Sequence, residues 1–200
     1  MSESGTIDEP IEDRILDAAV RCVARWGVGK TTLDDIAREA GCSRATLYRV
    51  LPGGRDALLV AATDRELQRF LRGLATRLDD TATLEDVIVS IIHEAVAAVS
   101  THDALQYLLS HEPEQIAPFV AFDALDPLLA EVTAFVHPWL ARHLDDVAAD
   151  EVGEWIARLV LSYGLEPADD LDLTRRDAVV ELVRFAVLPG IALAETSCAA

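Results

Sequence analysis

Apolar residues recur every three or four positions along most of this chain, and this spacing predicts amphipathic helices. No segment shows the alternation of apolar and polar residues that is typical of a half-buried strand. The first periodic stretch ends at Gly27, and its apolar positions are Ile11, Ile15, Ala18, Ala19, Cys22 and Trp26. We therefore expect an all-α protein.

A helix-turn-helix is predicted at about residues 33–52, where a tight turn separates two short periodic stretches. Gly41 follows the first stretch and can take the positive φ that ends a helix. Ser43 can cap the second helix by accepting hydrogen bonds from its first free N–H groups. The apolar face of the first helix consists of Leu33, Ile36, Ala37 and Ala40. In this motif the second helix enters the major groove of DNA, and an ordinary helical hairpin is the alternative.

The second helix of the motif has an apolar side and a polar side. Leu47, Val50 and Leu51 are expected to face the core. The opposite side carries Arg44, Ala45, Thr46, Tyr48 and Arg49. Side chains of this kind can contact base edges and phosphates.

The rest of the chain is predicted to form longer helices. A helix over residues 55–78 follows a turn at residues 52–54 and is long enough to connect a small N-terminal domain to a larger body. Residues 87–99 have a broad apolar face, which is expected at the centre of that body, and two amphipathic helices follow over residues 148–164 and 174–195. The middle region is expected to be broken or kinked by Pro113, Pro118, Pro127 and Pro138.

Charge is distributed unevenly along the chain. The net charge is −18, which is unfavourable for a protein that contacts nucleic acid. Residues 21–55, however, carry 7 basic and 3 acidic side chains, a net charge of +4. Because salt screens charges over about 8 Å under physiological conditions, an acidic body does not prevent a basic end from contacting DNA.

The sequence also disfavours several classes of protein and site. No apolar run reaches the length of about 18 residues that a membrane-spanning helix requires, and the first 13 residues are acidic rather than a basic signal peptide. The cysteines, at positions 22, 42 and 198, and the five histidines lack metal-binding spacing. No nucleophile motif, phosphate loop or dinucleotide fingerprint is present. We therefore expect a cytoplasmic protein that is not an enzyme and has neither a cofactor nor a metal.

The N-terminal segment resembles the DNA-binding domain of TetR-family transcriptional regulators. The resemblance covers about residues 9–65 and rests on residues 26–32, 36–37, 40–43 and 46–49. It departs from the family at Leu51, where Phe is common, and at residues 53–55, where the turn is one residue longer. The resemblance implies a three-helix DNA-binding domain at residues 9–65, and a helical ligand-binding and dimerisation domain at residues 66–200.

The resemblance also implies which residues contact operator DNA. Thr31 and Thr32 are expected to bind a phosphate, and Arg44 is expected to contact guanine, with a phosphate contact as its alternative. Ala45 and Thr46 can touch a thymine methyl group, and the remaining backbone contacts are assigned to Ser43, Tyr48, Arg49 and Arg55. The partner is an inverted-repeat operator, because family members act as homodimers.

Residues 107–113, 154–163 and 188–190 are similar to a narrower group, the actinobacterial regulators of fatty-acid synthesis. This similarity implies control by a long-chain acyl-CoA or fatty acid. A repressor of an efflux or catabolic operon that is released by an amphiphilic drug or another small molecule is the alternative. A more remote alternative is a ligand carrier or an enzyme with a vestigial DNA-binding domain. The expected cavity is lined by Ile88, Ile92, Val96, Tyr107, Phe119, Phe122, Phe135 and Trp139, and the alternative for each is ordinary core packing.

The two C-terminal amphipathic helices are expected to form a four-helix bundle between two subunits. Their apolar stripes supply the interface residues Ile156, Leu159, Val160, Tyr163, Val179, Leu182, Val183 and Ala186. Burial of these stripes within one chain is the alternative.

Overall fold

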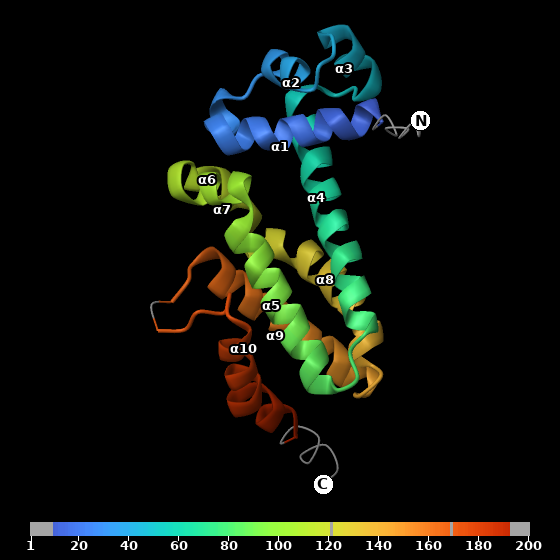
Figure 1. Ribbon diagram of the computed structural model, residues 1–200, viewed down its shortest axis with the longest axis vertical. Coiled ribbons are helices and arrows are strands. Elements are labelled where there is room, and N and C mark those ends of the chain that lie inside the picture. The colour runs from blue at the N-terminus through green and yellow to red at the C-terminus, as the bar shows by residue number, and fades with distance from the viewer. Residues whose placement is uncertain (1–9, 121, 169, 193–200) are drawn as a thin grey trace, which may run out of the picture. The chain divides into compact units, whose positions relative to one another are not determined.

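The computed structural model describes residues 10–120, 122–168 and 170–192 (Figure 1). This part of the chain is helical, apart from turns and an isolated β-bridge between Ala168 and Leu171. Its α-helices are α1 (Ile11–Lys30), α2 (Leu33–Glu39), α3 (Arg44–Val50), α4 (Gly54–Asp79), α5 (Leu84–Thr101), α6 (Asp103–His111), α7 (Pro113–Val120), α8 (Phe122–Leu140), α9 (Asp146–Leu165) and α10 (Arg176–Leu182), and a π-helical turn, η1 (Val183–Val187), follows. None of the described helices is both long and apolar enough to span a bilayer.

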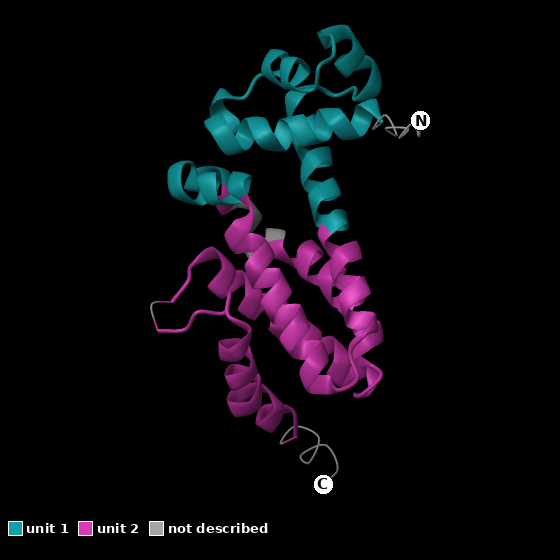
Figure 2. Ribbon diagram, in the orientation of Figure 1, with its two compact units in different colours: residues 1–69, 103–115 teal, residues 70–102, 116–200 magenta. Residues whose placement is uncertain are grey.

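The chain divides into two compact units (Figure 2). Unit 1 contains residues 1–69 and 103–115, and unit 2 contains residues 70–102 and 116–200. Residues 103–115, here called the α6 segment, are therefore part of unit 1 although helices of unit 2 precede and follow them in the sequence. Within unit 1, α6 packs along α1. A boundary near residue 65 alone does not describe this arrangement, because the segment returns to the N-terminal unit.

The core of unit 1 forms where the apolar faces of its short helices meet. Ile15 and Cys22 of α1, Ile36 of α2, Leu47 of α3 and Leu58 of α4 are all buried there. Val50 and Leu51 pack against the same cluster and remain half-buried. The inward side predicted for α3 is therefore confirmed.

Unit 2 is built around α5, as its broad apolar face predicts. Val87, Ile88, Ile92 and Val96 of this helix are buried. Within the unit, α5 packs against α8, α9, α10 and η1. Burying apolar surface on several sides of one helix stabilises the unit, because each buried leucine-sized side chain contributes about 1.5–3 kcal/mol.

Three local expectations differ from the structure. The helical region of α1 continues past Gly27 to Lys30, with a kink at Gly27, where φ is 79°. The predicted break is present at Pro113, which begins α7, but Pro127 and Pro138 lie inside α8. The packing of α8 on α9 and α5 offsets the hydrogen bonds that these two prolines remove. The last helix is interrupted by η1, and its predicted end at residues 193–195 lies outside the described residues.

Ion pairs fasten α1 to the N-terminal half of α4 within unit 1. Arg65 Nη1 lies 2.5 Å and Arg69 Nη2 lies 2.9 Å from Asp17 Oδ1. Burial opposes ionisation of Asp17, but hydrogen bonds and charge from the two arginines outweigh it and lower the pKa of this carboxyl. The ion pairs therefore stabilise the folded state whenever Asp17 is ionised.

This pKa shift predicts how stability depends on pH. A carboxyl with a lowered pKa stabilises the fold above its unfolded-state pKa of about 3.9, and this contribution disappears as the pH falls through the folded-state value. Asp17→Asn should therefore lower the free energy of unfolding at pH 7 by about 1 kcal/mol and make little difference near pH 2. Urea unfolding followed by circular dichroism measures this. Asp64→Asn, at an exposed position of α4, is the matched control, and a deficit in Asp17→Asn that persists at low pH would contradict the assignment.

Candidate DNA interface

The turn between α2 and α3 is held by side chains that cap both helices. Ser43 Oγ accepts a hydrogen bond from Thr46 N at 3.1 Å, which confirms the predicted cap of α3. Gly41 has a φ of 65°, as expected for a residue that ends a helix. Arg14 Nη2 donates to Ala40 O at 2.6 Å, a contact that the sequence analysis missed because its partners are 26 positions apart. These contacts fix the direction in which α3 leaves the turn.

The side of α3 opposite Leu47 faces solvent. Arg44, Ala45, Tyr48 and Arg49 are exposed there, and Thr46 is half-buried. This arrangement presents two guanidinium groups and a phenol on one short helix. Such groups suit direct contact with base edges and phosphates in the major groove.

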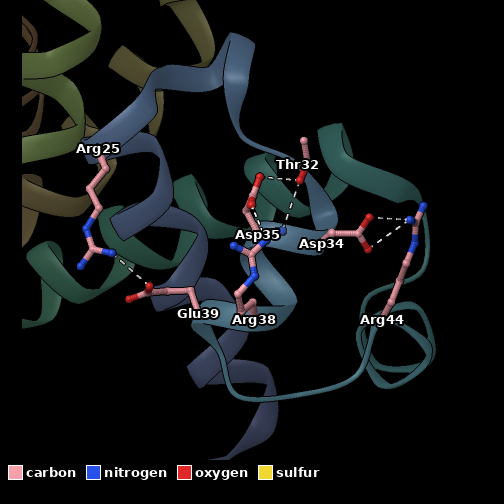
Figure 3. Close-up of polar contacts among 7 residues, drawn as sticks. All are labelled: Arg25, Thr32, Asp34, Asp35, Arg38, Glu39 and Arg44. Atoms are coloured by element: carbon pink, nitrogen blue, oxygen red, sulfur yellow. Dashed lines mark hydrogen bonds and ion pairs between the residues drawn. The ribbon is translucent and has the colours of Figure 1, made fainter.

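Arg44 is held by a carboxylate from the neighbouring helix. Its Nη1 atom lies 2.9 Å and 3.1 Å from the two carboxylate oxygens of Asp34 (Figure 3). Its guanidinium also lies 5.5 Å from the centre of the Tyr48 ring and donates to Tyr48 Oη at 3.4 Å. The hydrogen bond to Tyr48 and the charge of Asp34 raise the pKa of Arg44. Sequence reasoning did not assign a role to Asp34. An acidic residue in the first turn of a helix is already explained by its favourable interaction with the helix dipole.

The two threonines at the start of α2 have different roles. Thr31 is 1% exposed and its hydroxyl donates to Gly27 O at 2.6 Å, so this hydroxyl is not available to a phosphate. Thr32 is exposed and caps α2, accepting from Asp35 N at 3.2 Å and donating to Asp35 Oδ2 at 2.5 Å. The structure therefore corrects the expected hydroxyl contact of Thr31 and leaves Thr32 at the surface.

Arg55 lies in the first turn of α4 and contacts the end of α1. Its Nη1 atom donates to Val28 O at 3.2 Å, and its Nε atom lies 3.2 Å from Asp56 Oδ1. Its side chain is only partly exposed. Arg55 therefore holds the chain just before α2, in addition to the contact with flanking DNA that was predicted for it.

The other arginines near α2 form ion pairs within unit 1. Arg38 pairs with Asp35 at 2.7 Å, and Arg21 and Arg25 both pair with Glu39 at 2.8 Å and 3.1 Å. Figure 3 shows the pairs of Arg25 and Arg38 beside the cap at Thr32. Much of the local positive charge is thus matched by carboxylates, and α3 carries the arginines best placed to reach a groove.

Comparison with known proteins agrees with this geometry. Residues 15–62 match the family described as bacterial regulatory proteins, tetR family. An uncharacterized HTH-type transcriptional regulator of Mycobacterium tuberculosis is 28% identical over 182 residues, which cover 91% of this chain and 88% of that protein. Residues 15–62 are therefore a tetR-family DNA-binding domain. The matches indicate a DNA-binding transcriptional regulator and not an enzyme.

Solved structures share the fold of this chain. The repressor AlkX of a Dietzia strain, implicated in biodegradation of n-alkanes, has a TM-score of 0.63 at 19% identity and covers 91% of this chain and 95% of its own. The regulator FadR of Bacillus subtilis, solved in complex with stearoyl-CoA, has a TM-score of 0.56 at 18% identity and covers 86% and 96%. The all-helical architecture with an N-terminal helix-turn-helix is thus confirmed.

The residues predicted to line an effector cavity are divided between the two units of this regulator. Tyr107 belongs to unit 1, where it stacks on His111 and lines an open cleft of about 580 Å³ with Arg21 and Arg25. Ile88 and Ile92 are fully buried in the core of unit 2, and Phe135 and Trp139 pack against that core. Val96 lines a hollow of about 110 Å³ in unit 2. The side chains of Phe119 and Phe122 lie outside the described residues.

The two apolar stripes predicted to form the subunit interface are partly buried within the chain itself. Four of the predicted interface residues are buried in the core of unit 2, which agrees with the alternative of burial within one chain: Ile156, Val160, Val179 and Val183. Leu159, Tyr163 and Leu182 are half-buried, and Ala186 is exposed. Sequence reasoning missed Trp155 and Phe185, which are 44% and 88% exposed, because both stand outside the two stripes.

The ion pair of Arg44 predicts the effect of removing its partner. Asp34→Asn should bind a random-sequence duplex about two- to fivefold more tightly than the wild type, because exposed pairs stabilise by about 0.2–1 kcal/mol and one less carboxylate faces the phosphates. Fluorescence anisotropy at several salt concentrations measures this affinity. Asp64→Asn is again the control, and unchanged or weaker binding by Asp34→Asn would show that Asp34 does not restrain Arg44.

Proposed function

We propose that this regulator binds an inverted-repeat operator as a homodimer, with α3 of each subunit in the major groove. The exposed face of α3, held by the Ser43 cap and the buried Leu47, is the observation that carries the proposal. Two copies of one recognition helix related by a two-fold axis read two half-sites about one helical turn apart. The operator is therefore expected to have dyad symmetry.

Each exposed residue of α3 has a role in this proposal. Arg44 reads guanine through two of its guanidinium nitrogens, after it has exchanged Asp34 for the base. Ala45 and Thr46 contact a thymine methyl group, and Tyr48 and Arg49 bind phosphates. Thr32 and the N-terminus of α2 bind a further phosphate. Ser43 acts through its cap, and Arg55 contacts the flanking backbone.

The exposed aromatic residues of unit 2 support the homodimer. Phe185 of η1 and Trp155 of α9 are large apolar side chains on the surface of the chain. Aromatic residues are enriched at protein interfaces, and burying them removes apolar area from water. We propose that the outer faces of α9 and the α10–η1 helix form the subunit contact, with Leu159, Tyr163, Leu182 and Ala186 beside these aromatics.

The role of Arg44 predicts a specific defect. Arg44→Ala should lose discrimination at one base pair per half-site, at a cost of about 1–3 kcal/mol. Selection of bound DNA from a random pool identifies the operator, and duplexes with each base substituted then measure the preference. Arg38→Ala, on the neighbouring helix, should keep the preference. If Arg44→Ala weakens binding to all duplexes equally, Arg44 is a phosphate contact instead.

We also propose that the effector is apolar and is a long-chain acyl-CoA or fatty acid. A cationic drug requires a free carboxylate among apolar groups, for which the sequence offers Glu94, Glu112 and Asp123. The side chain of Asp123 lies outside the described residues, and the other two carboxylates are already engaged. Glu94 pairs with Arg77 at 2.9 Å, and Glu112 accepts hydrogen bonds from the main chain of residues 28 and 29. The strongly apolar α5 and the 110 Å³ hollow beside Val96 instead suit an alkyl chain.

The size of this hollow links binding to a change of structure. Ligand pockets usually have volumes of about 300–1,000 Å³, so an acyl chain must separate the helices around Val96 before it fits. A ligand that binds one arrangement of unit 2 better than another shifts the population between them. Because α4 runs from unit 1 into unit 2, and α6 of unit 1 follows α5 in the sequence, this shift can change DNA affinity.

A titration tests the proposed effector. Stearoyl-CoA should change operator affinity by about 5- to 150-fold, which corresponds to a coupling of about 1–3 kcal/mol, and operator should change stearoyl-CoA affinity by the same factor. Coenzyme A without the acyl chain is the control, and a quaternary ammonium amphiphile tests the drug alternative. If neither stearoyl-CoA nor free fatty acids of other lengths change operator affinity, the lipid effector is excluded.

A further inference from the structure

One carboxylate of the α6 segment binds the main chain just ahead of α2. Glu112 Oε2 accepts hydrogen bonds from Val28 N at 2.7 Å and from Gly29 N at 3.2 Å. These amides follow the kink at Gly27. All of these residues belong to unit 1. A carboxylate that accepts two main-chain N–H groups forms charge-assisted hydrogen bonds, which are stronger than neutral ones.

The backbone around Glu112 fixes where this carboxylate points. Glu112 is the single residue between α6 and α7. Its N–H donates to Leu108 O at 2.9 Å, and its carbonyl accepts from Gln115 N at 2.9 Å. Pro113 follows, and the residue before a proline is restricted to extended conformations. The side chain is therefore presented from a rigid junction.

The chain that receives the carboxylate is shaped for it. Gly27 has a φ of 79°, which side-chain-bearing residues rarely adopt. A Cβ atom at Gly27 would also lie 2.7 Å from Glu112 Oε2 and closer still to Oε1. Both the conformation and the space at Gly27 thus fit the contact with Glu112.

The same stretch leads directly into the start of α2. Residues 27–31, here called the Gly27 turn, are held by Arg55 at Val28 O and by the Thr31 hydroxyl at Gly27 O. Thr32, the next residue, caps α2. Any displacement of the Gly27 turn therefore moves the end of α2 that faces DNA in the proposed function.

We propose that Glu112 is a positioning residue for DNA binding, which ties the α6 segment to the Gly27 turn and so sets the start of α2. His102 is the single residue between α5 and α6, so a rearrangement of α5 is passed to the α6 segment and on to this turn. The proposal rests on the proposed function, because it needs α2 to contact DNA and unit 2 to bind the effector. When the Gly27 turn is already fixed by Glu112, unit 1 binds DNA more tightly, since less conformational entropy is lost on binding.

Glu112→Gln is the variant that tests this proposal, because it keeps the size of the side chain and removes its charge. Glu114→Gln, at an exposed position two residues on, is the matched control. In the full-length protein, amide hydrogen exchange at residues 28 and 29 should be about tenfold faster in Glu112→Gln. Affinity for the operator that the wild type selects should fall by about tenfold, and neither quantity should change in Glu114→Gln.

The effector measurement separates positioning from a purely structural role. The ratio of operator affinities with and without stearoyl-CoA should fall toward 1 in Glu112→Gln and stay at the wild-type value in Glu114→Gln. Glu112→Asp, whose shorter carboxylate reaches less far, should resemble Glu112→Gln. The thermal unfolding midpoint of each variant shows whether the fold is retained.

Three failures can be told apart. If the wild type selects operator DNA and Glu112→Gln matches it in exchange, affinity and effector ratio, Glu112 is not a positioning residue. If the wild type selects no DNA, the proposed operator reading fails, and the positioning role fails with it. If stearoyl-CoA leaves the wild type unchanged, only the lipid effector fails, and exchange and operator affinity still decide the role of Glu112.

Discussion

The DNA-binding surface depends on satisfying the main-chain polar groups at the ends of two very short helices. Helices α2 and α3 have seven residues each, so most of their N–H or C=O groups lie within four residues of an end and have no partner inside the helix. Isolated helices of this length are unstable in water. Thr32, Ser43 and Arg14 each supply one of these missing partners. The buried side chains of Ile36 and Leu47 anchor the two helices to the core of unit 1.

The same constraint explains why functional and structural roles overlap in unit 1. Thr31 is used inside the fold, whereas Thr32 both caps α2 and remains at the surface. Arg44 is paired with Asp34, so DNA must compete with a carboxylate for it. In the proposed operator complex, this competition weakens non-specific binding, because a random duplex does not place a guanine edge at Arg44 to offset the loss of the ion pair. The acidic body of the chain acts in the same direction.

Much of the helix-turn-helix could be predicted from the sequence because its determinants are local. The cap at Ser43, the positive φ of Gly41 and the inward position of Leu47 are each set by a few neighbouring residues. The contact of the α6 segment with the end of α1 could not be predicted, since Glu112 and Val28 are 84 positions apart. The role of Glu112 in holding the main chain is therefore not visible in the sequence, where Glu112 is one of 35 acidic side chains.

The apolar stripes of unit 2 show a different limit. A stripe at helical spacing indicates that a face is buried, but it does not distinguish burial in the same chain from burial in a partner. Ile156 and Val183 belong to the chain's own core, whereas the neighbouring Trp155 and Phe185 face outward. Similarly, Ile88 and Ile92 fill the core of unit 2, but their positions in the sequence are equally compatible with side chains that line a cavity.

Amide hydrogen exchange of the wild-type protein, free and bound to its selected operator, tests the central claim most directly. The claim is that the turns of unit 1 are held before DNA binds and that the starts of α2 and α3 then contact DNA. We predict that residues 28 and 29 are protected in the free protein, and that the first turns of α2 and α3 gain protection on binding. Unprotected amides at residues 28 and 29 in the free protein, or new protection that avoids both helix starts, would contradict the account.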